Sequence, residues 1–249
     1  MDEMTSPLSL AEYEAMPVGE RHKSNAFQRL TQEDRNRFFE QEEERREARR
    51  AEDMERYRRE ECQREVNKLP QELLTTFDLS QHPCSSAHAE VMAWVVGKIG
   101  MMLVGSTGMG KSRSLLQLLS KLIWQDVQII YWPAPRVADK ISALAFESSG
   151  ELDKFIHRLE SCPVLAIDDL GAHRPTERVC QELHRVIDTR YSEGRPLLVS
   201  SNCTPAQLQK RLLDEHGRTI RRLQDVTKAV HFAKSEPHAS GHPGKEAAP

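Results

Sequence analysis

"LVGSTGMGKSRSLLQLL", residues 103–119, runs from a short apolar segment through three glycines and a Lys-Ser pair into leucines at helical spacing. The stretch fits the pattern G-x-x-x-x-G-K-[S/T], with Gly105 and Gly110 as its fixed glycines and Lys111 and Ser112 as its final pair. Glycines let the backbone turn tightly and aim its N–H groups inward, and the following helix points the positive end of its dipole at the same place. The stretch therefore predicts a phosphate-binding loop between a strand and a helix.

Two side chains of this loop complete the expected phosphate site. Lys111 is expected to reach the β- and γ-phosphates of a nucleotide, and the Ser112 hydroxyl is expected to be a ligand of Mg²⁺. The loop residues expected to contact the nucleotide are Gly105, Ser106, Thr107, Gly108, Met109, Gly110, Lys111 and Ser112. The alternative is a glycine-rich turn that only connects a buried strand to a buried helix. The lysine and the hydroxyl favour the phosphate site.

The composition limits the class of protein. The 249 residues are 38% hydrophobic and 29% charged with a net charge of −3, so any nucleic-acid surface must be local. The five cysteines are scattered and odd in number, and the N-terminus does not resemble a signal sequence, which fits a reducing cytosol. The longest mostly apolar stretch, Val91–Val104, contains Lys98 and is too short to cross a bilayer. We expect a soluble cytoplasmic protein without a membrane partner.

The charge pattern divides the chain into four parts. Residues 1–27 are polar without a sustained period and are expected to be disordered or mobile. Residues 28–85 are expected to be a charged helical extension and linker, residues 86–233 the nucleotide-binding domain, and residues 234–249 a disordered tail.

The extension carries a long stretch without glycine or proline, Gln28–Leu69. Twelve Lys/Arg and thirteen Asp/Glu lie between Arg29 and Lys68, and opposite charges recur at i,i+4, as in Glu42–Arg46, Glu52–Arg56, Glu55–Arg59 and Glu60–Arg64. The apolar stripe is thin. This pattern favours a solvated single helix, and a helix that docks on a partner or pairs as a coiled coil remains the alternative.

Apolar runs alternate with helical patterns after residue 86. The expected strands are Met101–Val104, Val127–Trp132, Val164–Ile167, Pro196–Ser200 and Ala229–Phe232, with helices between them. Strands that alternate with helices indicate βαβ units and a mostly parallel sheet, hence an α/β fold with helices on both faces.

"SCPVLAIDDLG", residues 161–171, places two carboxylates after a buried strand. In a phosphate-loop fold the first, Asp168, is expected to hold Mg²⁺ through water from a neighbouring strand. Asp169 lies one residue farther along and can orient or deprotonate an attacking water. The alternative is an Asp-Asp turn after a strand, and the two βα elements that separate the pair from Lys111 argue against it.

"RPLLVSSNCTPAQL", residues 195–208, again ends an apolar strand in polar residues. The Asn202 amide is expected to hydrogen-bond the γ-phosphate and the attacking water. Either Asn202 or Thr204 can instead cap the helix that begins near Pro205, and we expect Thr204 to do so, which leaves Asn202 for the site.

These three stretches resemble the DnaC/IstB branch of the AAA+ ATPases. The resemblance rests on the loop Gly105–Ser112, on "DDLG" at Asp168–Gly171, on the helix ending in Arg190–Tyr191, and on a Pro-led strand ending in Ser201–Asn202. It covers roughly residues 88 to 232. It implies a P-loop NTPase (AAA+) three-layer sandwich with a parallel sheet, preceded here by the charged helical extension.

The resemblance also implies site roles. Lys111 and Ser112 take the Walker A places, Asp168 and Asp169 the Walker B places, and Asn202 the place of sensor 1. The family has a segment Arg-apolar-x-Ser-Arg-Leu whose arginines act on the neighbouring subunit's nucleotide. In "GRTIRRL" Arg218 and Arg222 take the arginine places, but Thr219 and Arg221 depart from the pattern, so the segment leaves three candidate arginines. The alternative is a basic helix face on the surface.

The resemblance implies an ATPase that uses ATP and Mg²⁺, assembles as a homo-oligomer on ATP or DNA, and loads a replicative helicase. The charged helix stands where the helicase-gripping region is expected. Single-stranded DNA contact needs cations and a stacking surface, for which the candidates are Tyr131, Trp132, Arg136 and Lys140; burial of the two aromatic rings is the favoured alternative. His82, Cys84 and His88, with Cys62 upstream, lack paired metal-ligand spacing, and we expect no zinc site.

Three other functions remain open. The first is an IstB-like transposition helper, which acts on duplex DNA with a transposase; a near-neutral extension argues against it. The second is a small-molecule kinase on the same loop, against which the paired aspartates and the asparagine favour hydrolysis. The third is a scaffold that binds nucleotide without hydrolysing it.

Overall fold

The computed structural model describes residues 7–23, 25–74, 82–147 and 149–233. Residues 1–6 of the expected mobile N-terminus, residues 75–81 of the expected linker and the whole expected tail, 234–249, lie outside the described residues. Backbone contacts divide the chain into two units, Met1–Glu61 and Cys62–Pro249. The division falls inside one long helix, so the expected charged extension belongs partly to each unit.

The second unit contains a five-stranded sheet in which each strand runs parallel to its neighbours. The strands are β1 (Gly100–Gly105), β2 (Ile129–Pro133), β3 (Val164–Asp168), β4 (Leu197–Ser201) and β5 (Thr227–Phe232). Their order across the sheet is β2-β3-β4-β1-β5. Strand β1 therefore lies between β4 and β5, and Val104 is paired with Ser201 and His231. The polar residues that follow β1, β3 and β4 thus meet at one edge of the sheet.

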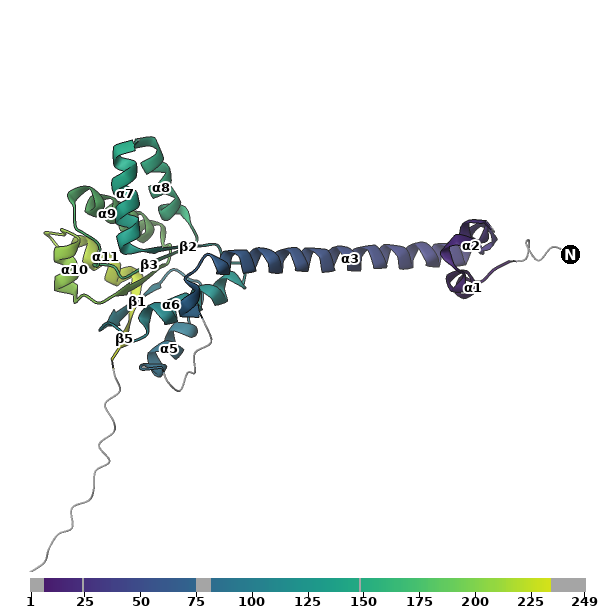
Figure 1. The fold of residues 1–249 in the computed structure, drawn as a ribbon, viewed down its shortest axis with the longest axis horizontal. Helices are drawn as coiled ribbons and strands as arrows, with labels where there is room; N and C mark the ends of the chain where they lie inside the picture. The colour runs from purple at the N-terminus through teal and green to yellow at the C-terminus, as the bar shows by residue number, and fades with distance from the viewer. Residues whose placement is uncertain (1–6, 24, 75–81, 148, 234–249) are drawn as a thin grey trace, which may run out of the picture. The chain divides into compact units, whose positions relative to one another are not determined.

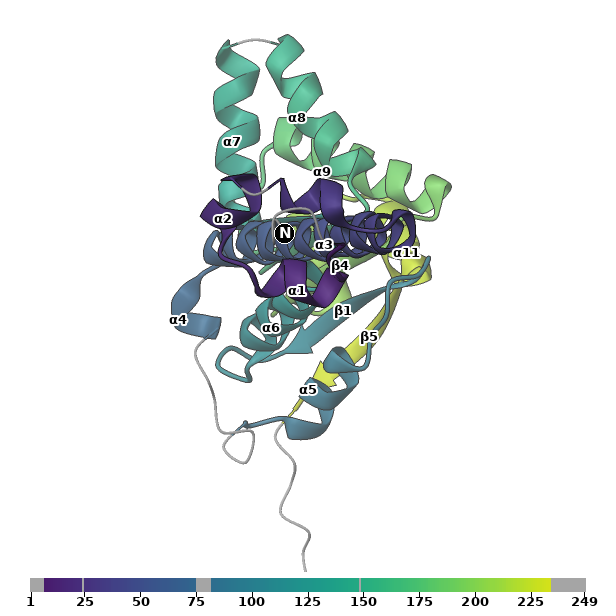
Figure 2. The same ribbon diagram turned by 90° about the vertical axis from the view of Figure 1, so that its right-hand side faces the viewer.

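Helices cover both faces of this sheet (Figures 1 and 2). One face is covered by α5 (Ser85–Met92), α6 (Lys111–Ile123) and the end of α3 (Gln32–Asn67), with α4 (Gln71–Leu74) packed on α6. The other is covered by α7 (Ala134–Glu147), α8 (Ser149–Ser161), α9 (Glu177–Glu193), α10 (Pro205–Arg211) and α11 (Arg218–Val226). The expected three-layer α/β sandwich is confirmed.

The apolar patterning explains this arrangement. All five residues of β3 are buried, as a strand covered on both faces requires. The stripe of α6, which includes Leu115, Leu118 and Leu122, is fully buried against the sheet. Helix α10 begins with a capping box between Thr204 and Gln207 and has proline at its first turn. The expected Thr204 cap is confirmed, and the Asn202 side chain is free for other contacts.

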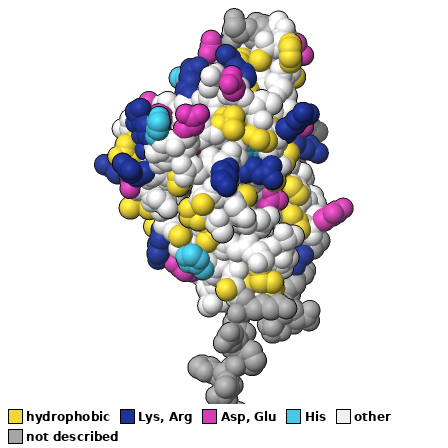
Figure 3. Space-filling view, turned by 90° about the vertical axis from the view of Figure 1, so that its left-hand side faces the viewer, with side chains coloured by type: hydrophobic (Ala, Val, Ile, Leu, Met, Phe, Trp, Pro, Cys, Tyr) yellow, Lys and Arg dark blue, Asp and Glu magenta, His cyan; other side chains and the backbone are white. Residues whose placement is uncertain are grey.

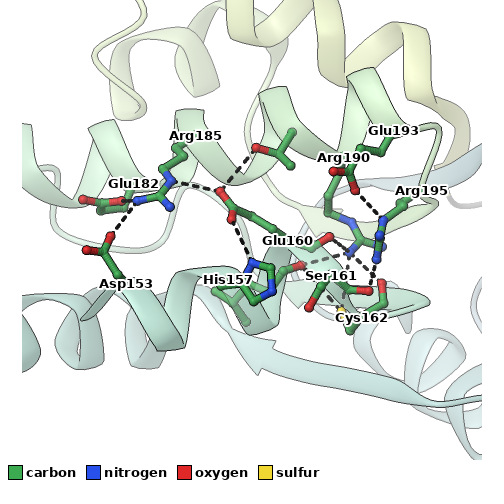
Figure 4. Close-up of polar contacts among 12 residues, drawn as sticks. Asp153, His157, Glu160, Ser161, Cys162, Glu182, Arg185, Arg190, Glu193 and Arg195 are labelled. Carbon is green, nitrogen blue, oxygen red and sulfur yellow. Dashed lines mark hydrogen bonds and ion pairs between the residues drawn. The ribbon is translucent and has the colours of Figure 1, made fainter. Parts of the chain in front are cut away.

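A buried arginine holds the turn between α8 and β3 against α9 and β4. The Arg190 side chain is completely buried, and its Nη1 donates to the carbonyl oxygens of Leu159 and Cys162, each at 2.9 Å, while Nη2 donates to that of Pro196. Burial lowers the pKa of this guanidinium. Figure 4 shows Arg190 pointing from α9 into this turn. The arginine of the Arg-Tyr pair near the end of α9 is therefore explained by a structural role.

A second, more exposed cluster of charged side chains joins helices α8 and α9 (Figure 4). Arg185 of α9 donates to Glu160 at 3.0 Å and to Asp153 at 2.9 Å, both on α8. Glu182 lies 3.8 Å from the same guanidinium. Because Arg185 is about half exposed, these ion pairs add little to the free energy of unfolding. Their main effect is to orient α8 relative to α9.

The first unit begins with short helices in a region whose sequence has no sustained period. It contains α1 (Leu10–Ala15), α2 (Val18–Lys23), a 3₁₀ turn η2 (Ala26–Arg29) and most of α3 (Gln32–Asn67). Tyr13, Phe27, Phe38 and Phe39 pack edge to face, with ring centroids 5.4 to 6.0 Å apart. Helices of six residues complete fewer than two turns, which is too short to produce a helical period in the sequence.

Helix α3 continues the first unit as a single solvated helix. No residue between Gln32 and Glu61 is buried in this described segment. Of the expected ion pairs, Glu55–Arg59 forms at 3.0 Å, whereas Glu42 pairs with Arg45 instead. Such pairs support an isolated helix by about 0.2–0.5 kcal/mol each. Among the residues that the structure describes, no helix has the length and apolarity that a bilayer crossing needs.

Candidate nucleotide-binding site

The glycine loop joins the end of β1 to the start of α6, as the sequence predicts. Gly105 and Gly110 have φ angles of 149° and 85°. A Cβ on Gly105 would lie 2.2 Å from the Phe232 carbonyl oxygen, and one on Gly110 would lie 2.4 Å from His82 Nε2. Both positions therefore require glycine, for conformation and for space. Helix α6 begins at Lys111 and directs its N-terminus toward the loop.

Lys111 lies against the loop rather than extending into solvent. Its Nζ donates to the carbonyl oxygens of Gly105 and Ser106, each at 2.8 Å, and to Asn202 Oδ1. Only 4% of Lys111 is exposed. Burial lowers the pKa of this ammonium, and the carboxylates of Asp169 and Asp168 oppose that change. The cation thus stays at the mouth of the loop, where phosphate oxygens would be bound.

Asp168 is held in a fixed orientation by three hydroxyl groups. Ser112 Oγ donates to its Oδ1 at 2.9 Å, Tyr131 OH donates to its Oδ2 at 3.3 Å, and Ser200 Oγ donates to Oδ1. The Ser112 hydroxyl and the Asp168 carboxylate are hard oxygen donors of the kind that Mg²⁺ prefers. Their direct contact fits the expected magnesium site, with the remaining positions left for water and phosphate.

Asp169 adopts a backbone conformation that is unusual for a residue with a side chain. Its φ is 55°, in the left-handed region, where residues other than glycine are strained by about 1–3 kcal/mol. The Ser200 hydroxyl accepts its N–H at 2.8 Å and keeps the backbone in place. Burial raises the pKa of the Asp169 carboxyl, and Asp168 raises it further, whereas Lys111 and Asn202 lower it. A carboxylate with a raised pKa is a better proton acceptor.

Asn202 connects the two halves of the site. Its Oδ1 accepts from Lys111 Nζ and its Nδ2 donates to Asp169 Oδ1 at 3.2 Å. The structure thus brings together Lys111, Ser112, Asp168, Asp169 and Asn202. A cavity of about 440 Å³ is lined by Leu73, His82, Pro83, Thr107, Gly108, Gly110, Lys111, Ser112, Arg113, Asp169 and Asn202.

The three candidate arginines of α11 do not line this cavity. Arg222 is ion-paired with Asp188 of α9, and its guanidinium lies 5.5 Å from the centre of the Tyr191 ring. Arg218 and Arg221 are exposed. The structure therefore separates the candidates: Arg222 has partners within its own chain, whereas the side chains of Arg218 and Arg221 are presented on the surface.

The candidate DNA-stacking rings are engaged within the domain. Tyr131 donates to Asp168, and Trp132 meets Phe155 edge to face with ring centroids 5.5 Å apart. Both contacts agree with the packing alternative. Arg136 and Lys140 remain exposed on α7. In Figure 3, which draws one face of the molecule, the Lys and Arg side chains of the described residues lie in separate groups among acidic and apolar ones.

The sequence does not predict a role in ATP chemistry for three residues near the cavity. Ser200 contacts both aspartates, Tyr131 contacts Asp168, and His82 lies against Gly110. Ser200 could have been identified from the sequence, because it is a polar residue at the end of an apolar strand. His82 and His88 form hydrogen bonds with Ser114, and within the described residues no group of three or more His, Cys, Asp or Glu is arranged to hold a metal.

Comparisons with solved structures agree with this fold. The AAA+ fold is shared with the DnaI structure, which aligns with a TM-score of 0.54 at 19% identity over 66% of this chain and 95% of that one. The DnaC helicase loader aligns with a TM-score of 0.51 at 18% identity, over 59% of this chain and 86% of that one. These alignments confirm the predicted AAA+ fold.

Sequence comparisons give the family. The chromosomal replication initiator protein DnaA 2 of Protochlamydia amoebophila (strain UWE25) is 28% identical over 107 residues, 43% of this chain and 23% of that protein. The match thus spans about a quarter of that relative. The sequence model for the IstB-like ATP binding proteins matches residues 17–230. The match covers most of both units, and the chain belongs to the IstB-like ATP binding protein family.

Proposed function

We propose that this cytoplasmic protein hydrolyses Mg·ATP to remodel a protein–DNA complex in DNA replication, as a DnaC-like loader of a replicative helicase. The observation that carries the proposal is the Asn202 bridge, which connects the phosphate-binding lysine to the aspartate suited to activate water. A site built only to bind nucleotide does not need that connection.

The residues divide the reaction between them. The loop N–H groups and Lys111 bind the β- and γ-phosphates, and Ser112 and Asp168 hold Mg²⁺, which neutralises charge on the phosphates when bound. Asp169 orients a water toward the γ-phosphorus and takes its proton as the new O–P bond forms and the bond to the ADP oxygen breaks. General-base assistance of this kind contributes about 10²–10⁴-fold to a rate.

An arginine from a neighbouring copy completes the site in this proposal. Arg218 and Arg221 are both exposed, whereas Arg222 is paired with Asp188; of the two exposed residues, Arg218 takes an arginine place of the family segment and is the best candidate. An arginine supplied in trans stabilises charge that develops on the γ-phosphoryl oxygens. Hydrolysis then depends on assembly of a homo-oligomer on ATP or DNA.

Helix α3 supports the helicase-loader form of the proposal. Its exposed segment between Gln32 and Glu61 carries both signs of charge, so it offers a partner protein ion pairs rather than a basic field. Duplex DNA would be bound better by a net positive extension. The exposed cations Arg136 and Lys140 of α7 are the candidates for contact with single-stranded DNA.

The second candidate function is an IstB-like transposition helper. The family match favours it, since that match covers residues 17–230 and therefore includes most of the first unit. In this form the partner is a transposase, and ATP controls assembly on duplex DNA.

Loading of the source organism's replicative helicase onto closed single-stranded DNA circles distinguishes the two. The wild-type protein with ATP is compared with the Lys111→Ala variant, and helicase retained on the circles is measured. Loading that needs ATP and Lys111 supports the loader. ATP-dependent assembly on duplex DNA without helicase loading supports the transposition helper, and no steady phosphate release under either condition rejects both.

A further inference from the structure

A buried cluster of two histidines and a serine packs against the phosphate loop, and one of its members, His82, also lines the cavity. His82, which precedes α5, has its Nε2 3.3 Å from Ser114 Oγ, and His88 of α5 has its Nδ1 2.9 Å from the same oxygen. The two imidazole rings lie 5.0 Å apart. All three side chains are at most 6% exposed. The helix α6, which begins at the end of the loop, is thus tied to α5 and to the residues just before it.

The hydrogen bonds fix the protonation of His82. The Cys84 N–H donates to His82 Nδ1 at 3.0 Å, so Nδ1 carries no proton and the neutral ring carries it on Nε2. Nε2 faces Gly110, since a Cβ there would lie 2.4 Å from it. The ring therefore occupies the space behind Gly110 and supports the loop at the point where α6 begins.

The conformation of Gly110 sets the direction of the N–H groups at the start of α6, which would bind phosphate. Gly110 is the N-cap residue of α6 with φ 85°, and its carbonyl oxygen accepts the Ser114 N–H at 2.9 Å. The next two residues are Lys111 and Ser112. A rotation of the Gly110 peptide would turn the following N–H groups away from the phosphates.

We propose that His82 is a positioning residue for phosphate binding, whose neutral ring holds Gly110 in the nucleotide-binding conformation and whose protonation releases it. The proposal rests on the proposed function, because it assigns a role toward a nucleotide in this loop. It goes beyond that function by making nucleotide affinity sensitive to pH through a residue outside the loop.

The surroundings of His82 oppose its protonated form. Among the described residues, titratable and charged groups that face it include Cys84 in its own segment, His88 of α5 and Arg113 of α6, and from β5 it meets the uncharged Phe232 ring at 6.2 Å. Burial lowers the pKa of His82, and Arg113 lowers it further, while hydrogen bonding with the Gly110 backbone opposes both. A protonated ring also cannot accept the Cys84 N–H. A protonated ring must turn away from the Cys84 N–H, and this movement also takes its Nε2 away from Gly110, so protonation is coupled to release of the loop.

The test measures Mg·ADP affinity by calorimetry with the full chain between pH 8 and pH 5. The variants are His82→Asn, whose Oδ1 can accept the Cys84 N–H without titrating, and His82→Ala, which loses the support. His157→Ala is the matched control, since the His157 side chain is 74% exposed on α8. The titration of ADP itself is the same in every series. The ratio of each variant's Kd to that of wild type therefore cancels the contribution of ADP and reports only the pH dependence that comes from the protein.

We expect wild-type and His157→Ala affinities to fall together below pH 6.5, with about a tenfold loss one unit below the midpoint. We expect His82→Asn to lack this loss, and His82→Ala to bind weakly at every pH. Equal pH profiles for wild type and His82→Asn would overturn the proposal even if His82→Ala does not fold. A wild type that ignores Mg·ADP at pH 7.5 would instead reject the nucleotide site itself.

Discussion

Replacing Arg190 with methionine removes a buried cation whose hydrogen bonds join three segments of the second unit. The carbonyl oxygens of Leu159, Cys162 and Pro196 would lose their hydrogen bonds to this guanidinium while remaining inside the fold. Hydrogen bonds to a charged group contribute about 1.5–3 kcal/mol each, so the three amount to about 5–9 kcal/mol. Release of the desolvation cost of the guanidinium returns several kcal/mol. The expected loss in the free energy of unfolding is therefore about 3–5 kcal/mol.

Guanidinium unfolding followed by tryptophan fluorescence measures this loss. All three tryptophans of the chain, Trp94, Trp124 and Trp132, lie in the second unit and report on it without the long helix. A loss of this size corresponds to a lower melting temperature by about 6–20 °C.

The matched control is Arg158→Met, which removes an exposed arginine from α8. It is expected to change the free energy of unfolding by about 0.5 kcal/mol or less. Arg190→Lys keeps the charge but loses the planar fork, and should lie between the two. If Arg190→Met costs no more than Arg158→Met, the buried carbonyl contacts do not stabilise the fold and the reasoning is refuted.

Three further predictions concern the nucleotide site and its surroundings. Asp169→Asn should lower steady ATP turnover at least about tenfold while the Kd for Mg·ATP stays the same, as phosphate release and calorimetry would show; unchanged turnover would remove Asp169 from the chemistry. Arg218→Ala should lower turnover only at concentrations where chains associate, whereas Arg222→Ala should lower the melting temperature because it frees Asp188; a loss for Arg218→Ala in dilute monomer would contradict a role in trans. Burial lowers the pKa values of His82 and His88, so the unfolded chain binds more protons below about pH 6.5, and stability to denaturant should fall as pH falls through and below that value; a stability that rises instead would refute the buried neutral assignment.

The sequence predicted the sheet and the convergence of Lys111, Asp168 and Asn202 because both follow from local signals. Strands buried on both faces read as short apolar runs, and the glycine loop has a fixed spacing. Parallel strands then bring their carboxyl ends to one edge, so residues far apart in the sequence meet without any long-range information beyond strand order.

Other features depend on contacts that leave no periodic signal. The start of the first unit is stabilised by the packed rings of Tyr13, Phe27 and Phe38. Tyr13 and Phe27 come from segments too short to show a helical period. Arg222 looked equivalent to Arg218 within "GRTIRRL", and only the position of Asp188 on a different helix separates them. His82 lies in an irregular segment, so its contact with Gly110 is set by tertiary packing alone.

The Asn202 amide carries an implication for how binding and hydrolysis are linked. Its carbonyl oxygen accepts from Lys111 and its amino group donates to Asp169, so both ends of one rigid side chain are engaged. A γ-phosphate that binds Lys111 competes with that carbonyl oxygen for the ammonium protons. Because the amide is planar and rotates as a unit, weakening one end changes the direction of the other. We therefore expect a phosphate bound at Lys111 to reorient Asp169, so that in the proposed reaction this carboxylate is aimed at water only after phosphate has arrived.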